Sequence, residues 1–276
     1  MRLEDTVFAR ETTSGELAVL FAGLPVHILE LGEVRRGADW LSGRIAEAGV
    51  WLADAETEED LRTLAAAARQ NEIRLLCGSA GLARAEVAVN AVGSDRHLVG
   101  SEPARLRGGP VLVVAGSRHP ATLKQVAMAE RVGISVRRPD WDGLRVAQKA
   151  EAFAYSLARE LMEGHSLVLS AEGLPVIPGS EAQVAEGLAG LACAALLQTN
   201  YVGGLALTGG DTAAAVCRAL GCQVIALHGE IQPGLGWGQL ADGRLPGLPV
   251  VTKAGGFGGE DALVEAVNFL QGPGPG

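Results

Sequence analysis

Three glycine-bearing segments are the places in this sequence where residue types and spacing could support chemistry. They span residues 115–119 (Ala-Gly-Ser-Arg-His), 208–212 (Thr-Gly-Gly-Asp-Thr) and 253–259 (Lys-Ala-Gly-Gly-Phe-Gly-Gly). Each follows a predicted strand and opens a predicted helix. Glycine lets the backbone approach a ligand closely, and the free N–H groups at a helix start favour an anion. One such segment is more often a tight turn, but three together favour phosphate or nucleotide binding.

Charged residues near these segments each allow two interpretations. Lys253 is one of only three lysines and could supply a positive charge to a phosphate. Asp211 could cap a helix or contact Mg²⁺ beside phosphates, and the residues leave both open. Glu230 could be a second carboxylate, although a solvated loop glutamate is favoured. His119 is interpreted as a helix-entry residue, with a general base as the less favoured alternative.

Several common catalytic patterns are absent from the sequence. It contains no G-x-x-x-x-G-K-[ST] segment, and no G-x-G-x-x-G follows a strand with an acidic residue at the expected distance. Ser117 lacks a G-x-S-x-G frame, which argues against a hydrolase nucleophile. The four cysteines form no C-x-x-C pair, so free thiols are favoured over a zinc site.

The elements that must position these segments alternate between short apolar runs and helical patterns. Strands are expected at 50–53, 74–77, 111–115, 134–137, 167–169, 205–207, 223–227 and 249–252. Helices are expected after an N-cap at Thr57, from Pro120, and over 143–162, 181–197, 212–220 and 261–270, with a glycine-rich loop at 229–243. The repeated order predicts an α/β fold, a mostly parallel sheet with helices on both faces. Right-handed crossovers then place every strand-to-helix loop at one sheet edge.

A stretch near residues 93–110 is rich in Gly and Pro and carries charges of both signs. It fits neither the helical nor the strand periodicity, and it therefore predicts a domain boundary. We expect a partial, smaller α/β domain over 1–93, a linker over 94–109 and a nucleotide-binding domain over 110–270.

Composition limits the partners of the chain. Its 276 residues carry 23 Lys+Arg against 32 Asp+Glu, a formal net charge of −9, with no basic cluster, so nucleic acid is not an expected partner. No apolar run of about 18 residues is present, and the first residues show no apolar signal region. We therefore expect no membrane association and a cytoplasmic location.

Four segments together resemble one family. Ser117, Thr122 and Gln125, the 208–212 segment, the Gly-Glu-Ile-x-Pro-Gly run at 229–234 and the 253–258 segment agree in order and spacing with the four-carbon acid sugar kinase family. The resemblance covers the nucleotide-binding C-terminal domain of that family. Residues 54–61 and 78–83 resemble the end of its N-terminal, substrate-binding domain.

The resemblance implies transfer of the γ-phosphate of ATP, with Mg²⁺, to a hydroxyl of a threonate, erythronate or 3-oxo-tetronate acid. The family normally opens with an Asp-Asp-x-Thr-Gly segment, which this sequence lacks. We therefore expect a chain that begins partway through the substrate domain and is inactive alone. A homodimer, or a partner that supplies the missing N-terminal segment, would complete it. The alternative is a non-catalytic nucleotide-binding module.

Candidate nucleotide-binding residues follow from the same resemblance. They are Ser117, His119, Thr122, Gly209, Gly210, Asp211, Thr212, Lys253, Gly255, Gly256 and Gly258, with Asp211 also as the metal ligand. His119 stands where the family often has a second serine. No catalytic base is assigned.

Overall fold

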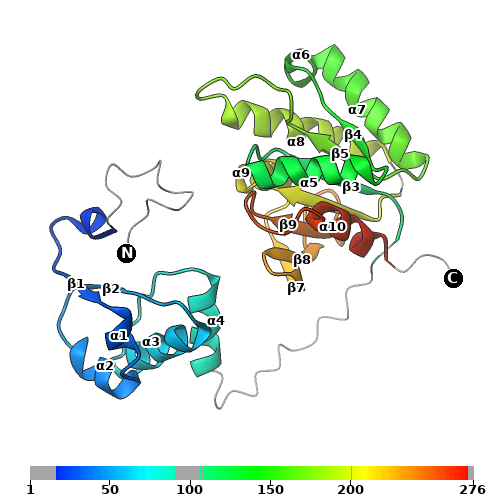
Figure 1. Ribbon diagram of the computed structural model, residues 1–276. Helices are drawn as coiled ribbons and strands as arrows, with labels where there is room; N and C mark the ends of the chain where they lie inside the picture. The colour runs from blue at the N-terminus through cyan, green and yellow to red at the C-terminus, as the bar shows by residue number, and fades with distance from the viewer. Residues whose placement is uncertain (1–16, 91–105, 107, 200, 273–276) are drawn as a thin grey trace. The chain divides into compact units, whose positions relative to one another are not determined.

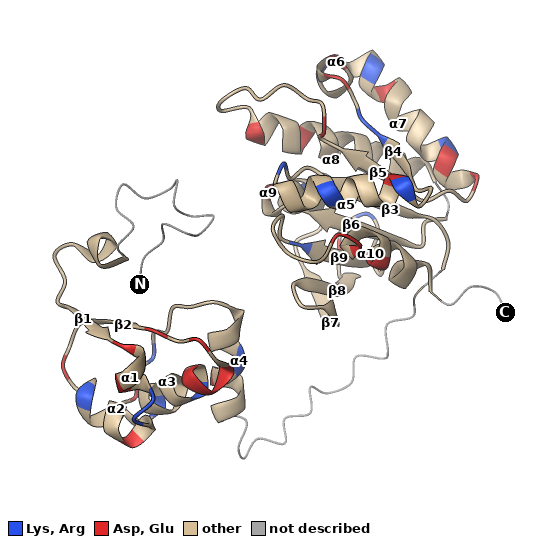
Figure 2. Ribbon diagram, in the orientation of Figure 1, with Lys and Arg blue, Asp and Glu red and all other residues tan. Residues whose placement is uncertain are grey.

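The computed structural model describes residues 17–90, 106, 108–199 and 201–272 (Figure 1). The chain divides into two compact units, residues 1–100 and 101–276, called here the N-terminal unit and the C-terminal unit. Most of the predicted linker lies outside the described residues. Acidic and basic residues are interspersed along the helices of both units (Figure 2). Among the described residues, no helix is long and apolar enough to cross a membrane.

The N-terminal unit contains a two-stranded parallel sheet packed against helices. Its elements are the 3₁₀ turn η2 (Leu17–Phe21), β1 (Val26–Leu29), α1 (Leu31–Val34), α2 (Ala38–Arg44), β2 (Val50–Ala53), α3 (Glu58–Gln70) and α4 (Ala80–Asn90). Leu29, Val34, Leu41, Ile45 and Ala67 form its buried core. The small number of these side chains leaves the unit with a modest core.

Helix α3 begins at the predicted N-cap. The Thr57 hydroxyl accepts a hydrogen bond from the Asp60 amide at 3.2 Å, and the Asp60 carboxylate accepts from the Thr57 amide at 2.9 Å. This reciprocal pair is a capping box. Arg35 also donates to Asp60 at 3.1 Å, and this hydrogen bond lowers the pKa of the Asp60 carboxyl well below its usual range.

One prediction for the N-terminal unit is wrong, and one strand of this unit was missed. Residues 74–77 form no strand, and Leu75 is 87% exposed. The strand that does pair with β2 is β1, which was not predicted. Residues 26–29 and 74–77 are both short and apolar. Which of them becomes a strand depends on pairing with β2, and a local sequence pattern does not reveal that pairing.

A seven-stranded sheet forms the centre of the C-terminal unit, in the order β4-β5-β3-β6-β9-β8-β7. The strands are β3 (Val111–Ala115), β4 (Ser135–Arg137), β5 (Leu167–Ser170), β6 (Gly204–Thr208), β7 (Ile225–Gln232), β8 (Leu235–Leu240) and β9 (Pro249–Lys253). Strands β4, β5, β3, β6 and β9 run parallel, whereas β8 is antiparallel to both of its neighbours.

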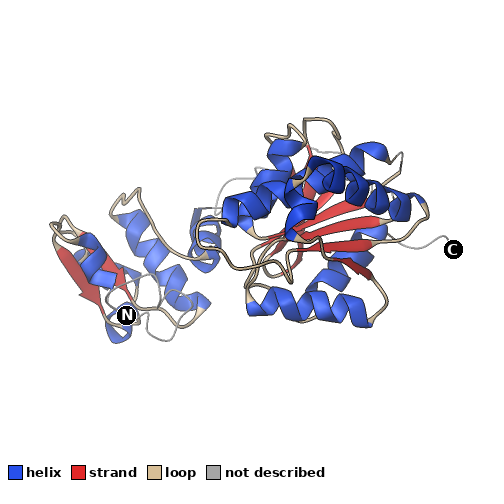
Figure 3. Cartoon of the chain, turned by 90° about the horizontal axis from the view of Figure 1, so that it is seen from above, coloured by secondary structure: helices blue, strands red, loops and turns tan. Residues whose placement is uncertain are grey.

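Helices cover both faces of this sheet (Figure 3). They are α5 (Pro120–Arg131), α6 (Trp141–Arg145), α7 (Ala147–Met162), α8 (Glu181–Gln198), α9 (Gly210–Ala219) and α10 (Ala262–Gln271). Alternate residues of β3 face opposite layers: Leu112 and Val114 join the core with α7, α8 and α9, and Val111 and Val113 join the core with α5 and α10. The predicted fold class is confirmed.

The structure corrects two boundaries in this unit. The helix predicted over 143–162 is two helices, α6 and α7, separated at Val146, whose backbone is extended. The loop predicted over 229–243 is largely a β-hairpin of β7 and β8. Its turn places Gly234 at φ +87°, and the Gly234 amide donates to Glu230 Oε1 at 2.6 Å. Glycines therefore shape a hairpin here, where they were interpreted as a loop.

Candidate functional site

Register places the ends of three parallel strands side by side. Ala115 of β3 pairs with Thr208 of β6, and Thr208 pairs with Lys253 of β9. Because the carboxyl ends of parallel strands share one sheet edge, the segments that follow these three residues meet there. We call residues 116–119, 209–212 and 254–259 the loop cluster.

The three segments touch one another through their glycines. A Cβ atom at Gly116 would lie 2.0 Å from Thr212 Oγ1, and one at Gly255 would lie 2.2 Å from Ser117 Oγ. A Cβ atom at Gly209 would lie 3.3 Å from the Ser117 side chain, and Gly209 has φ +100°. The absence of side chains at these positions is therefore what allows the segments to meet around Ser117.

His119 is the N-cap of helix α5, as predicted for a helix-entry residue. The His119 Nδ1 atom accepts a hydrogen bond from the Ala121 amide at 3.2 Å, and Pro120 fills the first helical position. The His119 amide donates to Ser117 Oγ at 3.2 Å. The imidazole also lies against Gly256 of the third segment.

Helix α9 begins two residues earlier than predicted, directly after Gly209. Asp211 lies in its first turn and is exposed, and its carboxylate makes no hydrogen bond or ion pair within the described part of the chain. Asp211 therefore does not cap the helix. Thr212, by contrast, is buried against Gly116. No group of three or more metal-ligating side chains occurs among the residues that the structure describes.

Lys253 is buried beneath the third segment, with 5% of its surface exposed. Its ammonium group donates hydrogen bonds to the carbonyl oxygens of Ala254 at 2.9 Å, Gly255 at 3.1 Å and Phe257 at 3.1 Å. Burial lowers the pKa of Lys253 to about 8. The ammonium donors are thus engaged by the loop itself.

Two further buried side chains, both from α5, donate to the same loop. Thr122 Oγ1 donates to the Gly255 carbonyl at 2.8 Å. Gln125 Nε2 donates to the carbonyls of Phe257, Gly258 and Gly259 at 3.0, 3.2 and 2.8 Å. Gln125 is one of the residues that carry the family resemblance, but it is missing from the residues predicted to bind the nucleotide. The sequence feature that points to Gln125 is its spacing from Thr122. The two polar residues are three positions apart, so they share one face of the helix that follows the first glycine segment.

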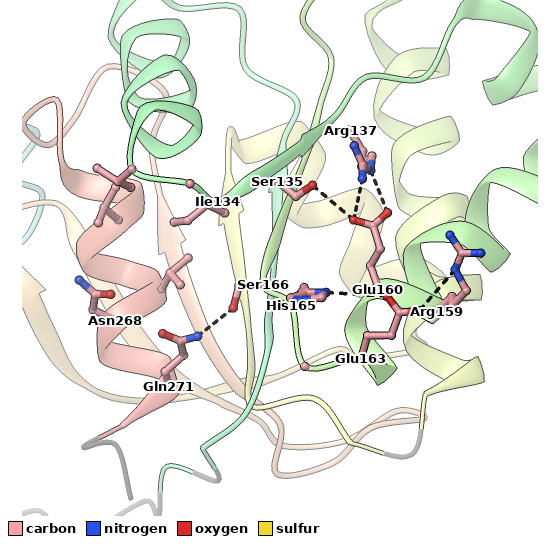
Figure 4. Close-up of a pocket in the computed structure, with 15 residues that line it drawn as sticks. Ile134, Ser135, Arg137, Arg159, Glu160, Glu163, His165, Ser166, Asn268 and Gln271 are labelled. Atoms are coloured by element: carbon pink, nitrogen blue, oxygen red, sulfur yellow. Dashed lines mark hydrogen bonds and ion pairs between the residues drawn. The ribbon is translucent and has the colours of Figure 1, made fainter.

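Figure 4 shows a cavity of about 820 Å³. It lies where β4 and β5 begin, at the edge of the sheet opposite the loop cluster. It is lined by residues around the ends of α5, α7 and α10 and the starts of β4 and β5. Several of its polar side chains pair with one another, among them Arg137 with Glu160 at 2.8 Å and Gln271 with Ser166 at 3.0 Å. The cavity is therefore separate from the predicted site.

Comparison with known proteins identifies the domain that holds the loop cluster. Residues 112–263 match the family model of the nucleotide-binding C-terminal domain. The chain is 33% identical to the D-threonate kinase of Salmonella typhimurium over 281 residues, covering 93% of this chain and 63% of the relative. It is 34% identical to the D-threonate kinase of Bordetella bronchiseptica, and the match covers 84% of this chain and 55% of that relative. The 3-oxo-tetronate kinase of Pseudomonas fluorescens is 29% identical, with 90% and 60% covered.

Solved structures agree with the fold. One from Bordetella bronchiseptica is 32% identical, with a TM-score of 0.52 and coverage of 94% of this chain and 61% of that chain. It is described as a domain-swapped dimer with bound citrate. One from Salmonella typhimurium has a TM-score of 0.75 at 20% identity, covering 96% and 66%, and shows the fold alone.

The covered parallel sheet, the glycine segments at its carboxyl edge and the domain match define a nucleotide-binding α/β protein. Within that class, the chain belongs to the four-carbon acid sugar kinase family. It spans 55 to 63% of the length of the two D-threonate kinases it matches.

Proposed function

We propose that the loop cluster binds ATP with Mg²⁺, as the nucleotide-binding part of a sugar-acid kinase. The observation that carries this proposal is the meeting of three glycine segments, two of them at the starts of α5 and α9. Helix starts offer unpaired N–H groups and a positive dipole end to phosphate. Ser117 and the 209–212 turn would contact the nucleotide, and Gly255 and Gly256 would pass close to it.

Asp211 fits the metal that a kinase would use. Its carboxylate is exposed in the loop cluster and free of partners in the described residues. Proteins hold Mg²⁺ through one or two carboxylates together with substrate phosphates, so one carboxylate is sufficient. Bound Mg²⁺ would neutralise charge on the phosphates.

The acceptor in this proposal is a four-carbon sugar acid, as the names of the related D-threonate and 3-oxo-tetronate kinases indicate. Phosphoryl transfer depends mainly on positioning and charge neutralisation, and the acceptor oxygen must lie within about 3–3.5 Å of the phosphorus. The N-terminal unit is proposed to be the closing part of a substrate domain. We expect the chain to bind ATP at the loop cluster.

Calorimetric titration with ATP, with and without Mg²⁺, tests nucleotide binding. Gly210→Val is a suitable variant because a Cβ atom at Gly210 meets nothing within 4 Å, so the new side chain would enter the space beyond the loop without disturbing the fold. Gly190→Val in α8 is the matched control, since Gly190 is also a helical glycine with open space beside it. Binding that Gly210→Val loses and Gly190→Val keeps would support the proposal. Unchanged binding in both would contradict the assigned site.

A turnover assay distinguishes the kinase from the alternative, a non-catalytic nucleotide-binding module. ADP formation is measured with D-threonate, D-erythronate or 3-oxo-tetronate as the acceptor. Acceptor-dependent ADP formation that Gly210→Val abolishes would establish the kinase. Saturable ATP binding without acceptor-dependent turnover would favour the binding module.

A further inference from the structure

Carbonyl groups of the glycine loop at residues 254–259 face buried donors on one side of the loop. Five of them accept hydrogen bonds at 2.8–3.2 Å from three side chains, and they belong to Ala254, Gly255, Phe257, Gly258 and Gly259. The donors are Lys253 Nζ, Thr122 Oγ1 and Gln125 Nε2, from residues no more than 5% exposed. The loop is therefore fixed from its buried side.

This arrangement dictates where the loop amides point. A trans peptide unit is planar, and its N–H is antiparallel to its C=O. No peptide bond among the described residues is cis. The N–H groups that follow the five bound carbonyls therefore point away from the buried donors; they belong to Gly255, Gly256, Gly258, Gly259 and Glu260. None of these amides donates a hydrogen bond within the described part of the chain.

We propose that Lys253, Thr122 and Gln125 are positioning residues that turn this row of amides outward as a binding surface for the phosphates of the nucleotide. The inference rests on the proposed function and deepens it, because it assigns Lys253 and Thr122 to the far side of the loop instead of to direct phosphate contact. The row lies inside the loop cluster, since Gly255 and Gly256 are packed beside Ser117 and His119. Successive backbone N–H groups form anion-binding concavities in proteins.

The chemistry of Lys253 suits this role. An ammonium group has three donors and no acceptor, which matches three converging carbonyls. Each of these carbonyls also has a second donor: the Phe257 amide for Ala254, Thr122 for Gly255 and Gln125 for Phe257. Lys253→Met therefore leaves no carbonyl unpaired and removes a buried charge, so this variant should stay folded.

Amide chemical shifts of the ¹⁵N-labelled full chain, titrated with ATP and Mg²⁺, test the inference directly. We expect the amide protons of Gly255, Gly256, Gly258 and Gly259 to shift in a saturable manner. Saturable ATP binding by calorimetry with these four amides unmoved would overturn the inference and leave the proposed function standing. Absence of any saturable ATP binding would overturn both.

The donors are tested by Lys253→Met, Gln125→Leu and the double variant, with Lys149→Met on the surface of α7 as the control. The double variant removes the side-chain donors of the Ala254, Phe257, Gly258 and Gly259 carbonyls, so the amide row loses its fixed direction and the Kd for ATP should rise about tenfold or more. The Tm of Lys253→Met should not fall below that of the wild-type chain. A lowered Tm with unchanged ATP affinity would show a merely structural role and contradict the inference.

Discussion

Residue 116 lies where the first segment of the loop cluster meets the third residue of α9. A Cβ atom there would lie 2.0 Å from Thr212 Oγ1 and 3.1 Å from Thr212 Cγ2. Gly116→Ala should therefore lower the free energy of unfolding by about 1–3 kcal/mol, the usual cost of overpacking a tight contact. Urea unfolding of the variant measures this loss.

A double-mutant cycle distinguishes this contact from a general effect of Gly116. Adding Thr212→Ala removes Oγ1 and Cγ2, two of the three Thr212 atoms that the new methyl group meets, so part of the lost stability should return. Strictly additive losses in Gly116→Ala and Thr212→Ala would show that the two residues are not in this contact.

The buried ammonium group of Lys253 makes stability depend on pH. Its pKa is lowered from 10.5 to about 8 in the folded chain. Between these values the unfolded chain binds more protons at this residue, so the contribution of Lys253 to the free energy of unfolding rises with pH. Below pH 8 both states are protonated and the full cost of burial remains.

Comparison with Lys253→Met isolates this effect, because the other titrating groups are common to both chains. Relative to the variant, the wild-type chain should gain stability between about pH 8 and about pH 10.5 in urea unfolding. A constant difference between the two chains across that range would mean that Lys253 titrates normally.

At the scale of an element, the start of α3 depends on one hydroxyl. Thr57 Oγ1 accepts from the Asp60 amide, and loss of such a cap costs about 1 kcal/mol. Thr57→Ala should lower the stability of the N-terminal unit by that amount and speed hydrogen exchange in the first turn of α3. Thr63→Ala, in the middle of the same helix, is the control and should leave exchange there unchanged.

Elements differ in how far sequence alone predicts them. Helix α5 was predictable because Pro120 marks its first residue, and the loop cluster because glycine is required where backbones meet. Strand β1 and the β7–β8 hairpin were not predictable. Whether these segments form strands depends on pairing with other strands, which the pattern of the segment itself does not show. The donors Lys253 and Gln125 could be noticed by type, but their direction toward loop carbonyls follows from tertiary packing.

At the scale of the whole molecule, the N-terminal unit has little to stabilise it by itself. Two-stranded sheets are marginal in water, and side chains such as Leu24, Ile28 and Leu75 are exposed by 59%, 55% and 87%. We expect the chain to associate, as a homodimer or with a partner that covers these side chains. Light scattering at micromolar concentration should give a mass of two chains, or of the complex, and a monomer would contradict this expectation.

The strand register described for the loop cluster also fixes the spacing between the three loops. Adjacent strands lie about 4.8 Å apart, so the three loops leave β3, β6 and β9 from points that span about 10 Å. A ligand that carries charge at one point can satisfy only part of such a row. A ligand with several phosphates in line can meet it along its length, so the sheet itself sets a preference for the length of the anion.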